Sequence, residues 1–194
     1  LYKRWPCVGT AHSHLKAAID IVVDHDLAPH DIAEIRLHVG DFHLLMSEPL
    51  NERIAPATLA DAKFSLPFLV AIAVVRRGMS VRDFTETGLR DPEVLKLGQK
   101  ISIVVDSGLD WGREMPPGRV EIRAVDGRSW IKEGHQVPGN ADNPLSWGDI
   151  SDKFRECASV AAKPLTQAQL SRAEDLAHSL ESLEDATELI RAIA

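Results

Sequence analysis

The chain has 194 residues, of which 44% are hydrophobic and 26% are charged, and these values are ordinary for a globular domain with a buried core. Its formal net charge of −7 argues against nucleic acid as a partner, because phosphate backbones bind to basic surfaces. The longest apolar run, residues 66–75, contains a proline and is too short to cross a bilayer. We therefore expect neither a nucleic-acid nor a membrane partner.

The two cysteines, Cys7 and Cys157, lie far apart in the sequence. They provide neither a disulfide framework nor the spacing of a zinc site. We therefore expect a reduced, cytoplasmic setting, with no metal ion and no cofactor.

The first 20 residues, LYKRWPCVGTAHSHLKAAID, place cations ahead of a helix. The apolar pattern predicts this helix from about Thr10 to Asp26. Lys3 and Arg4 precede it, and free N–H groups and the helix macrodipole favour an anion at the same place. An entry loop with solvated charges is the alternative.

Two histidines stand at the start of this predicted helix. At about 100° per residue, His12 falls beside the apolar stripe, whereas His14 is expected to point away from it. The two side chains therefore cannot chelate one metal ion together. His12 is either a half-buried histidine that is hydrogen-bonded at the helix start or a donor or acceptor to a substrate.

A strand is predicted next, because apolar and polar residues alternate over Ile32–Val39. A loop with little periodicity follows through about Leu59. Loops of this length often carry function, and four of its side chains could line a site, although solvated loop residues are the default: Asp41, His43, Glu48 and Arg53.

A central helix is predicted within Asp61–Arg77, because its residues are apolar nearly all round. Ser65 can cap its start at Leu66-Pro67, where proline is tolerated. Lys63 lies just ahead of the free amides of this start, and Gly78 is a signal for its C-terminal end.

The remaining pattern completes a small α+β unit and then changes to helices alone. Strands are predicted at 101–105, 119–125 and 129–132, the last two joined by an Asp-Gly hairpin turn. Beyond a Gly-, Pro- and Asn-rich linker, Ser146 and Thr166 open helices with capping boxes. We therefore predict an α+β fold with two parts: a sheet of about four strands covered by helices, residues 1–140, and a helical C-terminal segment, residues 141–194.

Three stretches of this sequence, taken in order, resemble the MmgE/PrpD family. They are Lys-Arg-Trp-Pro-Cys with His12 and LKAAID after it, AKFSLPFLVA from Ala62, and NPLS from Asn143 leading to KFREC. The family includes 2-methylcitrate dehydratases, cis-aconitate decarboxylases and an iminodisuccinate epimerase. The resemblance spans nearly the whole chain and indicates the C-terminal domain, since the complete subunit begins with a large helical domain.

The resemblance implies a metal-independent, homodimeric lyase acting on a small di- or tricarboxylate, most simply a hydro-lyase. It assigns Lys3 to carboxylate binding and charge stabilisation, with His12 as a second catalytic residue. Arg4, Ser65 and Phe68 are the expected substrate-binding residues. Phe68 stands where the family often has tyrosine, so the role of that hydroxyl cannot be transferred, and decarboxylation or epimerisation stays open.

Most acid–base residues of the family lie in the helical first domain. We therefore expect the present chain to be inactive by itself, with residues 141–194 packing on that domain. A non-catalytic module that binds a carboxylate or a partner protein is the alternative from a different functional class.

Overall fold

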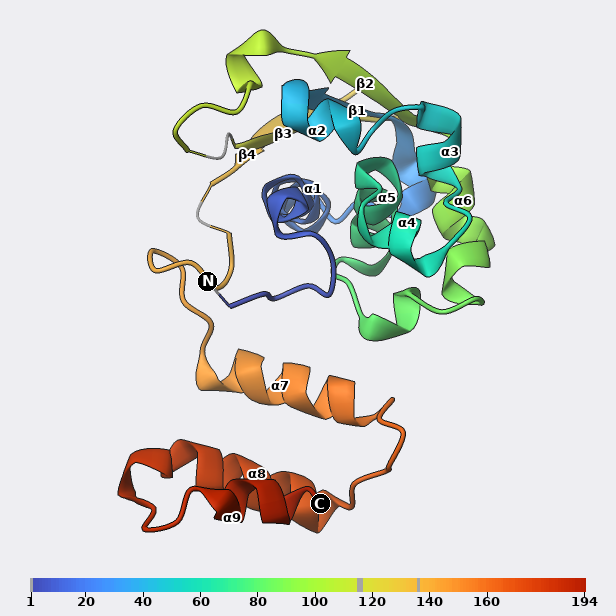
Figure 1. Cartoon of the computed structure of the whole chain (residues 1–194). Coiled ribbons are helices and arrows are strands. Elements are labelled where there is room, and N and C mark those ends of the chain that lie inside the picture. Colours follow the sequence, from blue (N-terminus) through green and yellow to red (C-terminus); the bar gives the residue numbers. More distant parts are fainter. Residues whose placement is uncertain (1, 115–116, 136) are drawn as a thin grey trace. The chain divides into compact units, whose positions relative to one another are not determined.

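The computed structural model of the chain describes residues 2–114, 117–135 and 137–194. The chain forms two compact units, residues 1–144 and residues 145–194. Figure 1 shows that the first unit contains a sheet with helices packed on it, whereas the second is built from helices. This mixture confirms the predicted α+β class.

The sheet has the strand order β2-β1-β3-β4. The central strand β1 (Ile32–Val39) pairs in parallel with β2 (Ile101–Val105) and antiparallel with β3 (Gly118–Ala124). An Asp126-Gly127 turn then leads into β4 (Ser129–Gly134), which pairs antiparallel with β3. All four predicted strands are therefore confirmed.

Two helices cover one face of this sheet. Helix α1 (His12–Asp24) packs against β3 and β4, and α5 (Leu66–Arg76) packs beside α1 (Figure 1). Every residue of α5 from Leu66 to Val74 is buried, which confirms it as the central helix. The buried strand residues that meet these helices are Ile35, Leu37, Val120 and Ile122.

Short helices make up much of the rest of the first unit. They are η1 (Gly9–Ala11), η2 (Pro29–Asp31), α2 (Asp41–Leu45), α3 (Leu50–Ile54), α4 (Leu59–Lys63), η3 (Val81–Asp83), η4 (Gly88–Arg90), α6 (Pro92–Gly98) and η5 (Ser107–Leu109), where η denotes a 3₁₀ helix. The prediction of a loop through Leu59 was wrong, since α2 and α3 lie within it. Five-residue helices are too short to show a helical period in the sequence.

Two further expectations need correction. His14 does not point away from the core but is fully buried, because the sheet packs on the side of α1 that carries it. At the end of α5 the left-handed residue is Arg77, with φ of 51°, rather than Gly78. The sequence Pro116-Pro117-Gly118 is a turn signal, but it lies partly outside the described residues.

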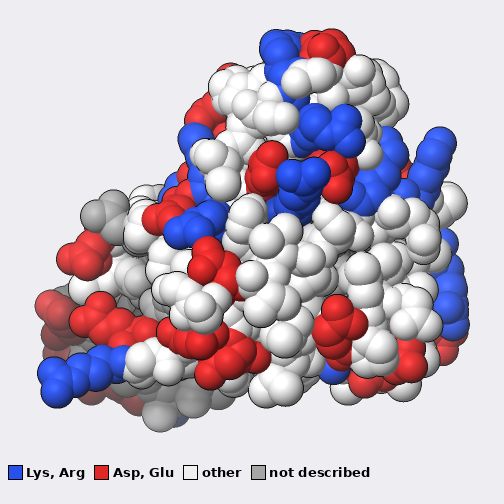
Figure 2. Space-filling model, turned by 90° about the horizontal axis from the view of Figure 1, so that it is seen from above, with Lys and Arg blue, Asp and Glu red and all other residues white. Residues whose placement is uncertain are grey.

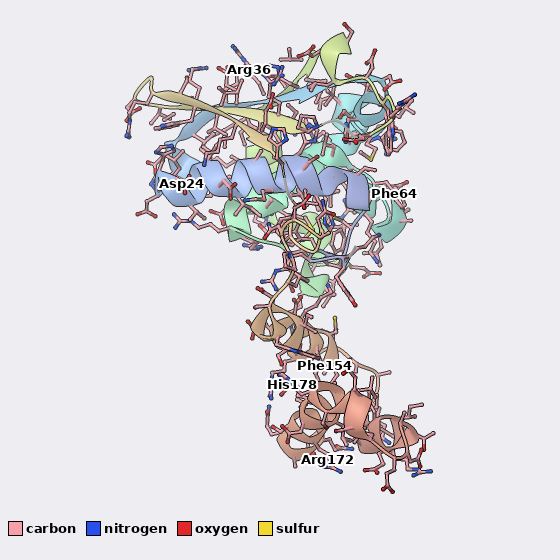
Figure 3. All side chains as sticks on the ribbon, turned by 90° about the vertical axis from the view of Figure 1, so that its left-hand side faces the viewer. Asp24, Arg36, Phe64, Phe154, Arg172 and His178 are labelled. Carbon is pink, nitrogen blue, oxygen red and sulfur yellow. The ribbon has the colours of Figure 1, made fainter. Side chains whose placement is uncertain are left out.

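The second unit contains α7 (Trp147–Ala158), α8 (Gln167–His178), η6 (Leu180–Ser182) and α9 (Thr187–Ala192). Both predicted capping boxes are confirmed, at Ser146 for α7 and at Thr166 for α8. Arg155 of α7 is paired with Glu174 of α8, and Figure 3 labels Phe154 and His178 on these same two helices.

The outer face of the sheet is polar. Arg36 lies on it, on the opposite side of the sheet from α1 (Figure 3), and its Nε lies 3.2 Å from Oε1 of Glu34. Glu121 of β3 and Arg123 extend the ion pairs across the strands. Figure 2 shows basic and acidic side chains lying next to one another on this side of the molecule, among uncharged ones, as expected for a sheet whose outer face meets water.

Two glycines allow α1 to approach the sheet closely. A Cβ atom on Gly118 would lie 2.2 Å from the backbone nitrogen of His14, and one on Gly134 would lie 1.7 Å from the carbonyl oxygen of Ser13. The two glycines are paired across β3 and β4. The first turn of α1 is therefore pressed directly onto the ends of these strands.

Gly134→Ala is predicted to destabilise the protein by about 1 to 3 kcal/mol, because the new methyl group forces backbone away from backbone. The measurement is the free energy of unfolding in urea, followed by tryptophan fluorescence. Gly112→Ala is the matched control, since its added methyl group would have no described atom within 4 Å. Equal stability of the two variants would contradict the close approach.

Candidate functional site

The N-terminal residues 2–11, here called the entry segment, are hydrogen-bonded to the backbone just ahead of α5. The backbone N–H of Val8 donates to the carbonyl of Lys63 at 3.1 Å, and the N–H of Leu66 donates to the carbonyl of Met46 at 2.9 Å. In Figure 3, Phe64 lies at the end of α1 opposite to Asp24. The structure thus brings together the starts of α1 and α5, which the sequence separates by more than 50 residues.

Lys3 is exposed and folds back over the turn of the entry segment. Its Nζ lies 3.4 Å from the carbonyl oxygen of Cys7, and its Cε lies 3.7 Å from the position of a Cβ on Gly9. Arg4 is half-buried. The ammonium group of Lys3 therefore lies near the 3₁₀ turn that leads into α1, on the solvent side.

His12 is fully buried rather than half-buried. Trp5 of the entry segment packs edge-on against its ring, with the ring centroids 5.1 Å apart. The two side chains therefore join the entry segment to the first turn of α1, and Trp5 covers the histidine.

Ser65 and Phe68 are also fully buried. The hydroxyl of Ser65 donates to the carbonyl of Arg53 and accepts from the backbone N–H of Phe68 at 3.4 Å. The ring of Phe68 lies in the core. Both residues shape the start of α5, as the N-cap prediction required.

Lys63 is a further cation at this junction. The sequence indicated only that it precedes α5, whereas the structure shows that its carbonyl binds the entry segment and that its Nζ lies 5.5 Å above the Phe84 ring. Such a contact between residues far apart in the chain leaves no signal in a single sequence.

Three histidines come together beneath the entry segment. Nε2 of His14 lies 3.0 Å from the carbonyl oxygen of His38, and Nε2 of His43 lies 3.1 Å from the carbonyl oxygen of Thr10. The rings of His14 and His43 are in edge contact, with centroids 4.7 Å apart. Since a carbonyl oxygen only accepts, each Nε2 carries the hydrogen.

Burial favours the neutral form of both rings. Loss of hydration, reinforced by the neighbouring His43, lowers the pKa of His14 to about 3. Burial also lowers the pKa of His43, although its bond to Thr10 opposes the shift. His43 was expected only as a loop residue that could line a site, and its place beside His14 could not be foreseen without α2.

The described part of the chain contains no group of three or more His, Cys, Asp or Glu side chains arranged to hold a metal ion. Cys7 is buried and Cys157 is exposed, and the two are not joined by a disulfide. Among the residues with described positions, no helix has the length and apolarity needed to cross a membrane.

A cavity of about 730 Å³ opens on the first unit, and it contains none of the five predicted site residues. It is lined by Ala57, Thr58, Leu59, Glu86, Thr87, Leu89, Arg90, Asp91 and Pro92. Lys3 instead lies on an open surface, beside two helix starts.

The fold and the junction define an α+β domain with a basic entry segment attached to a pair of buried helix starts. A comparison with known families then identifies the class: the family described as MmgE/PrpD C-terminal domain matches residues 5–179. The chain belongs to this family, which confirms the resemblance. Lys3 and Arg4 precede the matched residues, and a search of curated proteins found no significant match.

Acidification is predicted to destabilise the first unit through His14. Its ordinary pKa is 6.5 and its folded pKa is about 3, so between these values the unfolded chain binds more protons and stability falls as the pH falls. At pH 5 the loss from this residue is about 2 kcal/mol relative to pH 7.

The measurement is urea unfolding at pH 7 and pH 5. His14→Gln should flatten the difference between the two pH values, even if it lowers stability at both. His30→Gln is the control, since His30 is exposed, and it should keep the wild-type difference. A His14→Gln variant with an unchanged pH dependence would refute the assignment.

Proposed function

We propose that this chain is the C-terminal domain of a lyase that acts on a small di- or tricarboxylate, most simply a hydro-lyase for a 2-methylcitrate-like acid. The observation that carries the proposal is the family match over residues 5–179. The entry segment adds to it, because an exposed lysine next to a helix start suits a carboxylate.

Dehydration of such an acid removes a proton from a carbon next to a carboxylate and expels hydroxide from the neighbouring carbon. Negative charge develops on the carboxylate during proton removal, and positioned cations stabilise it. In the proposal, Lys3 supplies this charge and Arg4 helps to bind the acid.

The other predicted site residues act in the proposal from buried positions. His12 serves as a second catalytic group only when Trp5 moves aside, because the ring is covered. Ser65 and Phe68 act on substrate binding by fixing the start of α5.

The remaining acid–base groups come, in this proposal, from a preceding helical domain. That domain would enclose the substrate over the open surface at Lys3 and would also pack on residues 141–194. The proposed assembly is a metal-independent, cytoplasmic homodimer. The present chain alone is then inactive.

Decarboxylation or epimerisation on the same scaffold is the second candidate. The specific observation that favours it is Phe68, whose fully buried ring offers no hydroxyl where the family often has one. A proton transfer that uses this hydroxyl would be lost here. A carboxylate- or partner-binding module without catalysis is the remaining candidate.

Lys3→Ala in the complete gene product is predicted to lower kcat/KM by about 100-fold or more, since it removes the charge that stabilises the developing anion. The substrates to offer are 2-methylcitrate, cis-aconitate and iminodisuccinate. Lys96→Ala is the control, because Lys96 is exposed on α6, and it should retain wild-type turnover.

Two results would count against the proposal. If the complete protein binds but does not turn over any of the three acids, the binding module is favoured. If it turns over one of them and Lys3→Ala is as active as Lys96→Ala, the role of Lys3 is wrong while the lyase stands.

A further inference from the structure

The entry segment is held at Thr10 by two side chains of one short stretch. The Nε2–H of His43 donates to the Thr10 carbonyl at 3.1 Å, and the Thr10 hydroxyl lies 3.7 Å from Sδ of Met46. The first contact acts on the backbone of Thr10 and the second on its side chain, and Thr10 lies between Lys3 and α1. The position of the Lys3 loop therefore depends on α2 as well as on α1.

His43 is itself fixed in place. Only 1% of it is exposed, and the hydroxyl of Ser47 donates to its carbonyl at 2.8 Å. The rings of Phe42 and His14 both pack edge-on against its ring. A side chain held this firmly can fix the group that it binds.

We propose that His43 is a positioning residue: its neutral ring fixes the Thr10 carbonyl and thereby holds the Lys3 loop in the geometry that binds a carboxylate. The carboxylate part of this statement rests on the proposed function, whereas the hold on the entry segment does not.

The bond from His43 to the Thr10 carbonyl depends on the rings of His14 and His43 both being uncharged. A proton added to either ring would place a charge 4.7 Å from the centroid of the other, in a buried site where that charge loses its hydration. The groups that act on the pair are the carbonyl and the ring of His38 from β1, which act on His14, and Asp41 at the start of α2, whose charge favours a protonated His43 and opposes the effect of burial. Glu121 of β3 faces the ring of His38 at 3.8 Å. No carboxylate contact to the two rings is present among the described residues.

A consequence for pH follows from this arrangement. Conformations in which the rings of His14 and His43 separate and become hydrated bind protons more readily than the packed pair does. These open conformations are therefore favoured as the pH falls. The entry segment is then released together with Lys3. Substrate affinity is expected to weaken on the acid side for this reason.

The first test measures amide hydrogen exchange in the complete protein. His43→Leu, which removes the donor, should raise the exchange of the Val8 amide by about 10-fold at pH 7.5, the size expected for one lost hydrogen bond and its partner left unsatisfied. His43→Gln, which keeps an N–H donor, should stay near the wild-type rate. The amides of Leu69–Val74 in α5 report whether each variant is folded.

The second test uses His43→Gln to separate titration from packing, in case His43→Leu does not fold. Between pH 7.5 and pH 5.5, after correction for intrinsic rates, exchange at Val8 should rise in the wild type and rise less in His43→Gln, which cannot titrate there. His30→Gln is the matched control and should follow the wild type, since His30 is exposed.

Steady-state kinetics of the His43 variants then test whether the bond from His43 to Thr10 affects the reaction. With whichever carboxylate is turned over, His43→Leu should raise KM more than it lowers kcat, and His43→Gln should restore KM at pH 7.5. Exchange at Val8 that is the same in wild type and both variants would overturn the proposal. If exchange changes as expected while none of the three acids is bound or turned over, the hold by His43 is supported and the proposed function fails.

Discussion

The close approach of the first turn of α1 to the ends of β3 and β4 is the constraint on which the rest of this unit depends. Gly118 and Gly134 leave room for backbone to meet backbone at Ser13 and His14. Because α1 is fixed there, the ring of His14 lies between α1 and the sheet and bonds to the backbone of β1. The entry segment passes the N-terminal end of α1 before it leads into that helix. The need for glycine at positions 118 and 134 thus determines where the entry segment, with its basic side chains, lies.

Two further elements act on that segment from its other sides. The carbonyl of Lys63 binds it at Val8 just ahead of α5, and His43 of α2 binds it at Thr10. The segment is therefore anchored along its length by neutral or backbone groups, while its charge at Lys3 remains at the surface. This division suits a domain that supplies a cation to a site completed by another polypeptide surface, which is how the proposed lyase would use it.

The sequence was sufficient for the elements that bury long periodic faces: the four strands, α1, α5 and the capped helices of the second unit follow their apolar patterns and N-cap residues. It was insufficient for α2 and α3, which are shorter than two helical turns. His14 was misplaced because a helical wheel identifies the most apolar side of α1, but α1 is covered both by α5 and by the sheet. The contact of Lys63 with the entry segment and the contact between His14 and His43 arise from tertiary packing, so no local sequence pattern predicts them.

The central claim is that the entry segment presents Lys3 to an organic acid while buried groups hold its backbone. A crystal structure of the complete protein with a bound tricarboxylate tests it most directly. The account predicts a carboxylate oxygen within hydrogen-bonding distance of Lys3 Nζ, with the bonds from His43 to Thr10 and from Val8 to Lys63 intact. A ligand bound away from Lys3, or an entry segment detached from α2 in the liganded protein, would contradict it.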